Sequence, residues 1–96
     1  HAREDMTHHR VVDLIVNSKL DLKWIGERFE RFADKLDTDY RDELSSQIKV
    51  LREFVQKAEA DWKSVDANEF ANAKQRLDEA SVRLQEVSIT ESLKQQ

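Results

Sequence analysis

The chain has no cysteine and no proline, and Gly26 is its only glycine. Without cysteine it can form neither a disulfide framework nor a thiolate metal site, which fits a reducing compartment. The scarcity of proline and glycine leaves little turn chemistry and argues against a fold of many strands. No apolar run approaches the roughly 20 residues of a membrane-spanning helix, and no signal-peptide pattern is present.

Charged residues make up 38% of the chain and apolar residues 39%, a balance that favours amphipathic helices with solvated outer faces. Lys and Arg are scattered among Asp and Glu, and the net charge is −4, so the clustered basic face of a nucleic-acid-binding protein is not visible. We expect neither nucleic acid nor a membrane as partner. The 96 residues fit one small domain, and because the chain opens on His1-Ala2 rather than methionine, we expect a fragment of a longer protein.

Apolar side chains recur at alternating spacings of three and four residues, which is typical of helices packed in a bundle. The pattern predicts helices over residues 2–35, 39–60 and 66–90, with a frayed polar tail from Glu91. Thr38 or Asp39 is expected to cap the second helix and Asp66 the third. The predicted fold is all-α: an antiparallel three-helix bundle, one domain over residues 1–96, with an over-long first helix projecting from it. We expect the bundle core to comprise Leu22, Ile25, Phe29, Phe32, Leu36, Leu44, Ile48, Leu51, Val55, Phe70, Leu77 and Leu84.

The run Val11–Val16 has five aliphatic residues out of six, on more than one helical turn. A helix that is apolar all round needs cover on all sides. At 1.5 Å per residue the first helix would span roughly 50 Å against roughly 33 and 37 Å for the others, so its N-terminal half should project and expose a partner surface. The alternative is that the run is ordinary core of a fully formed bundle. We expect the partner surface to comprise Met6, Val11, Val12, Leu14, Ile15, Val16, Lys19, Leu20 and Lys23.

The third helix carries a Leu-x-x-Ala-Ser-x-x-Leu-x-Glu pattern from Leu77 to Glu86, and Ala33-Asp34-Lys35-Leu36 closes the first helix before an acidic turn. These motifs, and the order of long helix, acidic turn, helix, short acidic linker and helix, resemble the C-terminal part of the DnaK-type, seventy-kilodalton heat-shock chaperones. The resemblance covers nearly all of the chain. The opening Ala2-Arg3-Glu4-Asp5-Met6 and the length of the first helix look most like the HscA branch, which serves iron–sulfur cluster assembly.

The resemblance implies the helical lid of a substrate-binding domain, which closes over a β-sandwich that grips an extended hydrophobic peptide. The partners would be the sandwich of the same parent chain and, indirectly, the client peptide, and isolated copies would pair through helix one. This stretch would be no enzyme and hold no cofactor or metal; ATP and Mg²⁺ would belong to the parent's ATPase domain. The compartment would be the bacterial cytoplasm or the mitochondrial matrix. The family latches its lid through an Asp and a His, and this chain departs from that pattern because Lys19 and Lys23 stand there.

Two other functions fit parts of the pattern. Three heptad helices with Trp24 and Trp62 are also typical of a spectrin-like structural or adaptor bundle, whose helices would run the full length of one another. A metal-dependent enzyme could use His9 with Asp5 or Asp13, but His8 points about 100° away and a closed site needs more ligands. No nucleophile elbow and no Gly-rich phosphate loop is present, so we expect no catalytic chemistry.

Overall fold

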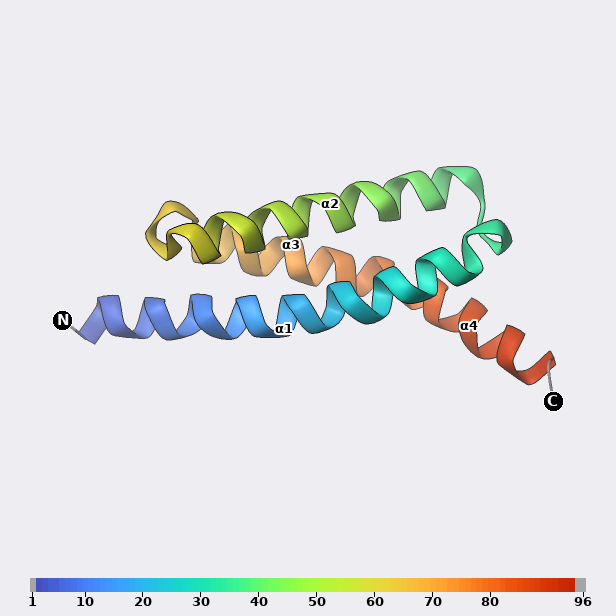
Figure 1. The fold of residues 1–96 in the computed structure, drawn as a ribbon, viewed down its shortest axis with the longest axis horizontal. Helices are drawn as coiled ribbons and strands as arrows, with labels where there is room; N and C mark the ends of the chain where they lie inside the picture. The colour runs from blue at the N-terminus through green and yellow to red at the C-terminus, as the bar shows by residue number, and fades with distance from the viewer. Residues whose placement is uncertain (1, 95–96) are drawn as a thin grey trace.

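The structure is a computed structural model that describes residues 2–94, with side chains from Met6 onward. Its order is α1 (Ala2–Phe32), η1 (Ala33–Lys35), α2 (Thr38–Ala60), η2 (Trp62–Ser64), α3 (Ala67–Ala80) and α4 (Val82–Lys94). Helices are the only regular elements between residues 2 and 94, which confirms the predicted all-α class and the long first helix. The chain reverses direction after α1 and again after α2, while α4 turns away from α2, contacts α1 and then diverges from it toward the C-terminus (Figure 1).

The core is a continuous seam of aliphatic and aromatic side chains contributed by all four α-helices. Leu22 and Phe29, which the sequence placed in the core, lie half-buried against it. Val11 is fully buried as well, and the small side chains of Ala58 and Ala73 complete the seam. The other predicted core residues are buried: Ile25, Phe32, Leu36, Leu44, Ile48, Leu51, Val55, Phe70, Leu77 and Leu84.

Helices α2 and α3 differ in how their N-termini are capped. Asp66 accepts hydrogen bonds from the backbone N–H groups of Asn68 and Glu69, at 2.8 and 3.1 Å, and so satisfies two free amides of α3. The cap predicted for α2 was wrong: the N-cap is Asp37 rather than Thr38 or Asp39, and its side chain makes no capping bond. The Asp37 carboxylate instead accepts a 2.8 Å hydrogen bond from Arg83 of α4.

The single helix predicted over residues 66–90 is two helices, α3 and α4, separated at Ser81. The hydroxyl of Tyr40, on α2, donates to the carbonyl of Ala80 and accepts the N–H of Leu84 at 3.3 Å. In an unbroken α-helix that N–H would bond to that carbonyl directly. A side chain inserted into the hydrogen-bond ladder is a recognised cause of a helix kink, and it explains the break. Helix α4 then continues to Lys94, through part of the tail predicted to fray.

The N-terminal half of α1 is packed from His8 onward, so only the residues before His8 extend beyond the other helices (Figure 1), and the overhang is shorter than predicted. Helix α2 runs for 23 residues and η2 extends it, so together they reach back along α1 as far as His8. Val11 is enclosed there, and Arg10 donates a 2.9 Å hydrogen bond to the side chain of Asn68 on α3. The predicted overhang of α1 was too long because the comparison of helix lengths left out η2 and the turn that follows it.

Candidate partner surface on α1

The aliphatic run of α1 is divided between the core and solvent. Val11 is 0% exposed, and Leu14 and Ile15 pack half-buried against the core. Val12 and Val16 are 40% and 53% exposed on the opposite side of the same turns. The prediction that Val11 belongs to a partner surface is therefore wrong, because its position faces the seam. Val12 and Val16 remain candidates.

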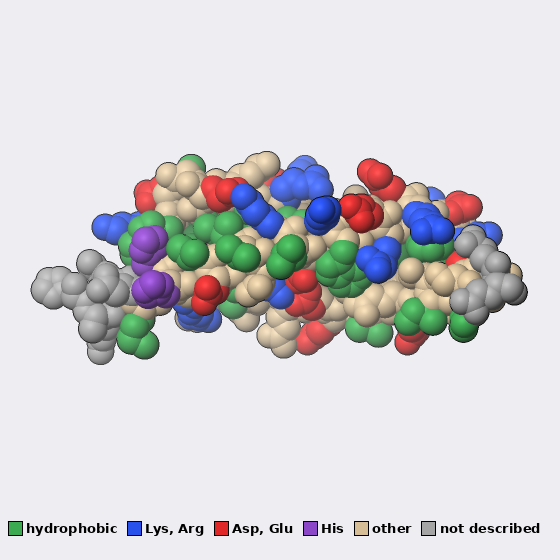
Figure 2. All heavy atoms as spheres, turned by 60° about the horizontal axis from the view of Figure 1, so that its bottom comes forward, with side chains coloured by type: hydrophobic (Ala, Val, Ile, Leu, Met, Phe, Trp, Pro, Cys, Tyr) green, Lys and Arg blue, Asp and Glu red, His purple; other side chains and the backbone are tan. Residues whose placement is uncertain are grey.

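Val12, Val16 and Leu20 follow one another at intervals of four residues, so they form a stripe along the outward face of α1. Leu20 is 59% exposed, and Met6, nearer the N-terminus, is 71% exposed. Figure 2 shows hydrophobic side chains in a broken row along one face of the molecule, between charged ones. We call Val12, Val16 and Leu20 the α1 stripe. Several large aliphatic side chains exposed along one helix face are typical of a partner surface.

Two lysines continue this face toward the C-terminus. Lys19 and Lys23 follow Val12 at seven and eleven residues, which are helical repeats that return to the same side of α1. The ammonium of Lys19 lies 2.5 Å from a carboxylate oxygen of Glu59 on α2, and both side chains are largely exposed. An exposed ion pair of this kind contributes only about 0.2–1 kcal/mol, so Lys19 can exchange Glu59 for another carboxylate at little cost.

The N-terminal end of this surface is anchored by an aromatic contact. The ring of His8 stacks on that of Trp62 in η2, with centroids 4.7 Å apart and planes 22° from parallel. The ammonium of Lys63 lies 5.6 Å from the centroid of the same indole. His8 is exposed, but its ring stacks on Trp62 and also on His9, with His8 and His9 centroids 6.4 Å apart, whereas Asp13 is exposed.

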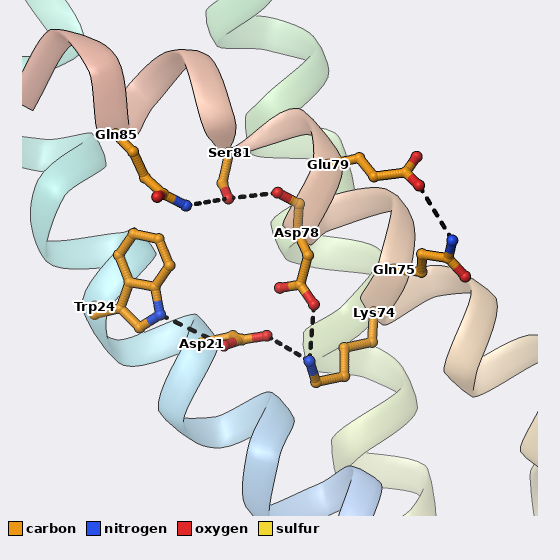
Figure 3. A network of polar contacts seen from close by, with 8 residues as sticks. All are labelled: Asp21, Trp24, Lys74, Gln75, Asp78, Glu79, Ser81 and Gln85. Carbon is orange, nitrogen blue, oxygen red and sulfur yellow. Dashed lines mark hydrogen bonds and ion pairs between the residues drawn. The ribbon is translucent and has the colours of Figure 1, made fainter.

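The middle of α1 is fixed to α3 by a polar cluster, drawn in Figure 3. Lys74 contacts Asp21 of α1 at 2.9 Å and Asp78 of α3 at 2.8 Å. Burial raises the pKa of Asp78, and the adjacent Asp21 carboxylate raises it further. Burial also opposes ionisation of Asp21, but hydrogen bonds with Asp78 and Lys74 outweigh it and lower the pKa of Asp21. The cluster holds the backbone behind the α1 stripe in one register.

Two further features were sought among the described residues: a metal-binding cluster and a membrane-spanning helix. No group of three or more His, Cys, Asp or Glu side chains comes together there in a way that could hold a metal ion. The side chain of Asp5, one of the ligands considered from the sequence, lies outside the described residues. Between residues 2 and 94, every helix is too short or too polar to cross a bilayer.

Comparison with protein-family models, with curated proteins and with solved structures found no match to this chain. The predicted partner surface missed the division of the aliphatic run, although Val11 stands four residues before Ile15 and eleven before Leu22, at spacings that return to the core side of α1. It also missed Tyr40, which has no local signal because its partners are 40 and 44 residues away.

Proposed function

We propose that this chain is the helical lid of the substrate-binding domain of a chaperone of the DnaK type, and most like the HscA branch. The lid would be an antiparallel three-helix bundle that closes through the outer face of α1 on a β-sandwich of the same parent protein. The observation that supports this proposal is that exposed aliphatic residues and the expected latch positions lie on the same face of α1. Val12 and Val16 lie on the same side of α1 as Lys19 and Lys23, the positions where the resemblance places the latch.

The free energy expected from covering the α1 stripe is of the size that a lid switching between open and closed states needs. Covering three half-exposed aliphatic side chains would contribute about 1 kcal/mol each, or about 3 kcal/mol in all. A two-state switch driven by nucleotide in another domain needs a difference of a few kcal/mol, neither much more nor much less. With lysines in place of the family's Asp and His, the latch on the sandwich would consist of carboxylates. The parent would be an ATPase in iron–sulfur cluster assembly, in the bacterial cytoplasm or the mitochondrial matrix, with ATP and Mg²⁺ bound outside this chain.

A spectrin-like or adaptor bundle is the second candidate, and one observation favours it. Such a bundle requires helices that cover one another along their length, and α1 is packed as far back as His8 and Val11. Both candidates use the α1 stripe for protein contacts. They differ in whether that contact opens and closes.

The test uses the longer protein that contains this chain, loaded with a fluorescent hydrophobic peptide. Replacing Val16 by Asp and Lys23 by Glu should speed peptide release about tenfold, because the lid closes less tightly. Replacing the exposed Val50 by Asp and Lys49 by Glu on α2 is the matched control and should leave release unchanged. Equal release rates for all three proteins would refute the lid and leave the adaptor.

A second measurement addresses the isolated chain. If its copies pair through α1, sedimentation equilibrium should show a dimer that weakens with Val12→Asp and not with Val50→Asp. A monomer at every concentration would refute pairing through α1. The lid proposal would then be decided by the peptide-release experiment.

A further inference from the structure

A second surface lies at the C-terminal half of α1, where α4 turns away from α2 and packs against the first helix (Figure 1). Two adjoining hollows follow the line between the two helices, with volumes of about 380 and 260 Å³. Arg28 and Ser88 line both of them, so they form one trough, which we call the α1–α4 groove.

The groove combines apolar walls with hydrogen-bond donors. Trp24 and Ile89 line one hollow and Phe32 the other, and Ile89 is 61% exposed. Arg28, Arg31 and the hydroxyl of Ser88 provide donors along its length. Such a lining suits a ligand that presents both aliphatic and acidic groups.

The two guanidinium groups are preorganised. Cζ of Arg28 lies 4.9 Å from the centroid of the Trp24 ring, and Cζ of Arg31 lies 5.3 Å from that of Phe32. Nη1 of Arg28 also donates a 3.4 Å hydrogen bond to the carbonyl of Trp24. Stacking on an aromatic face fixes a guanidinium plane, and its remaining N–H groups can bind a carboxylate. Among residues 6–94 neither arginine is paired with a carboxylate, whereas Arg83 has Asp37 and Lys74 has Asp21.

The spacing of Arg28 and Arg31 indicates how far apart two carboxylates of a ligand must lie. Residues three apart on a helix have Cβ atoms about 5–6 Å apart. Acidic side chains three or four apart on a helical peptide match that distance, and so do alternate residues of an extended strand, at about 6.6 Å. We propose that the α1–α4 groove binds an acidic peptide segment, with two carboxylates on Arg28 and Arg31 and an aliphatic side chain on Trp24 and Ile89. This site is independent of the lid function, because it lies further toward the C-terminus of α1 than the α1 stripe.

The probe is a synthetic peptide of repeating Glu-Leu-Glu-Glu-Leu-Glu, with a control peptide in which Gln replaces every Glu. Binding is followed by the fluorescence of Trp24 in the full chain carrying Trp62→Phe, so that one indole reports. The acidic peptide should bind, its binding should weaken with salt, and the Gln peptide should bind at least about tenfold more weakly.

Variants locate the site. Arg28→Gln combined with Arg31→Gln should weaken binding at least about tenfold. Arg28→Lys should have an intermediate effect, because lysine keeps the positive charge but cannot form two parallel hydrogen bonds with a carboxylate. Arg76→Gln on α3 is the matched control, since Arg76 is also exposed and helical, and should leave binding unchanged. Glu27→Gln should strengthen binding, because it removes a carboxylate that lines the same groove. Circular dichroism of each variant verifies that it is folded.

Three results would overturn the proposal: equal binding of the acidic and Gln peptides, equal weakening by Arg76→Gln, or no effect of the double arginine variant in a folded protein. Oligothymidylate and vesicles of anionic lipid are tested as competitors. If either binds as tightly as the peptide through the same two arginines, the groove is a general polyanion site and the peptide proposal is wrong. Failure here would leave the lid proposal standing, because Val16→Asp and Lys23→Glu lie outside the groove.

Discussion

The ammonium of Lys74 on α3 lies 2.9 Å from a carboxylate oxygen of Asp21 on α1, across the middle of the bundle. The same ammonium donates a 2.8 Å hydrogen bond to Asp78, one turn further along α3. One cation therefore serves two carboxylates, and the second carboxylate is the one whose pKa is raised. The arrangement couples the α1–α3 contact to pH.

Two opposite pH effects on stability follow from this cluster. As the pH falls from neutral, Asp78 takes up a proton in the folded chain above the ordinary value of 3.8, so the free energy of unfolding should rise through that window. Below 3.8 the unfolded chain protonates Asp21 while the folded chain keeps it ionised, so stability should then fall. Each effect should stay below about 1 kcal/mol because the groups are partly exposed to water.

Urea unfolding measured from pH 7 downward, in the wild type and two variants, separates these effects from those of the other carboxylates. Asp78→Asn should remove the rise on the mildly acidic side, and Asp21→Asn should remove the share of the acid loss that belongs to Asp21. Identical difference curves for the two variants would show that neither carboxylate has a shifted pKa of the stated sign.

Ser18 occupies the core-facing position of α1 between Ile15 and Leu22, fully buried, and its hydroxyl has no hydrogen-bond partner among the described residues. Ser18→Ala should therefore stabilise the chain by about 1 kcal/mol, which corresponds to about 4–8 °C in Tm for a domain of this size. The exposed Ser45→Ala on α2 is the control, because it gains the helix propensity of alanine without the burial. Thermal unfolding should show a larger gain at Ser18; equal gains would mean that the buried hydroxyl is satisfied.

Gly26 lies within α1 and has no positive φ that would require glycine. A Cβ built at Gly26 would meet no other atom within 4 Å, so the position has room for a side chain. Gly26→Ala should raise the free energy of unfolding by about 0.5–1 kcal/mol through reduced entropy of the unfolded chain and better helix propensity. Chemical denaturation gives the value. A loss of stability would mean that the helices pack more closely at this point than the structure indicates.

Periodicity was enough to predict the helical class, most core positions and the cap at Asp66, because these depend on residues within a few turns of one another. It failed where a distant contact decides the outcome. The packing near the start of α1 involves Trp62 of η2, which stacks on His8 from more than fifty residues away, and the break at Ser81 involves Tyr40. The α1–α4 groove lies between two helices that are far apart in the sequence, so no local pattern could have predicted it.

The break between α3 and α4 should depend on the hydroxyl of Tyr40. Tyr40→Phe removes the hydroxyl that separates the Ala80 carbonyl from the Leu84 N–H, and nothing else at this position changes in shape. The two groups should then bond directly, since a buried pair left unsatisfied costs about 1–3 kcal/mol, and α3 and α4 should straighten into the single helix that the apolar spacing predicts. Residual dipolar couplings of the backbone amides measure the angle between α3 and α4, and the Leu84 amide should exchange more slowly. Arg83→Gln is the control: it removes the guanidinium stacked on the Tyr40 ring and the ion pair with Asp37 but keeps the hydroxyl, so the kink should remain. A kink that persists in Tyr40→Phe would mean instead that the packing of α4 on α1 imposes the bend, with the tyrosine only occupying a gap that this packing creates.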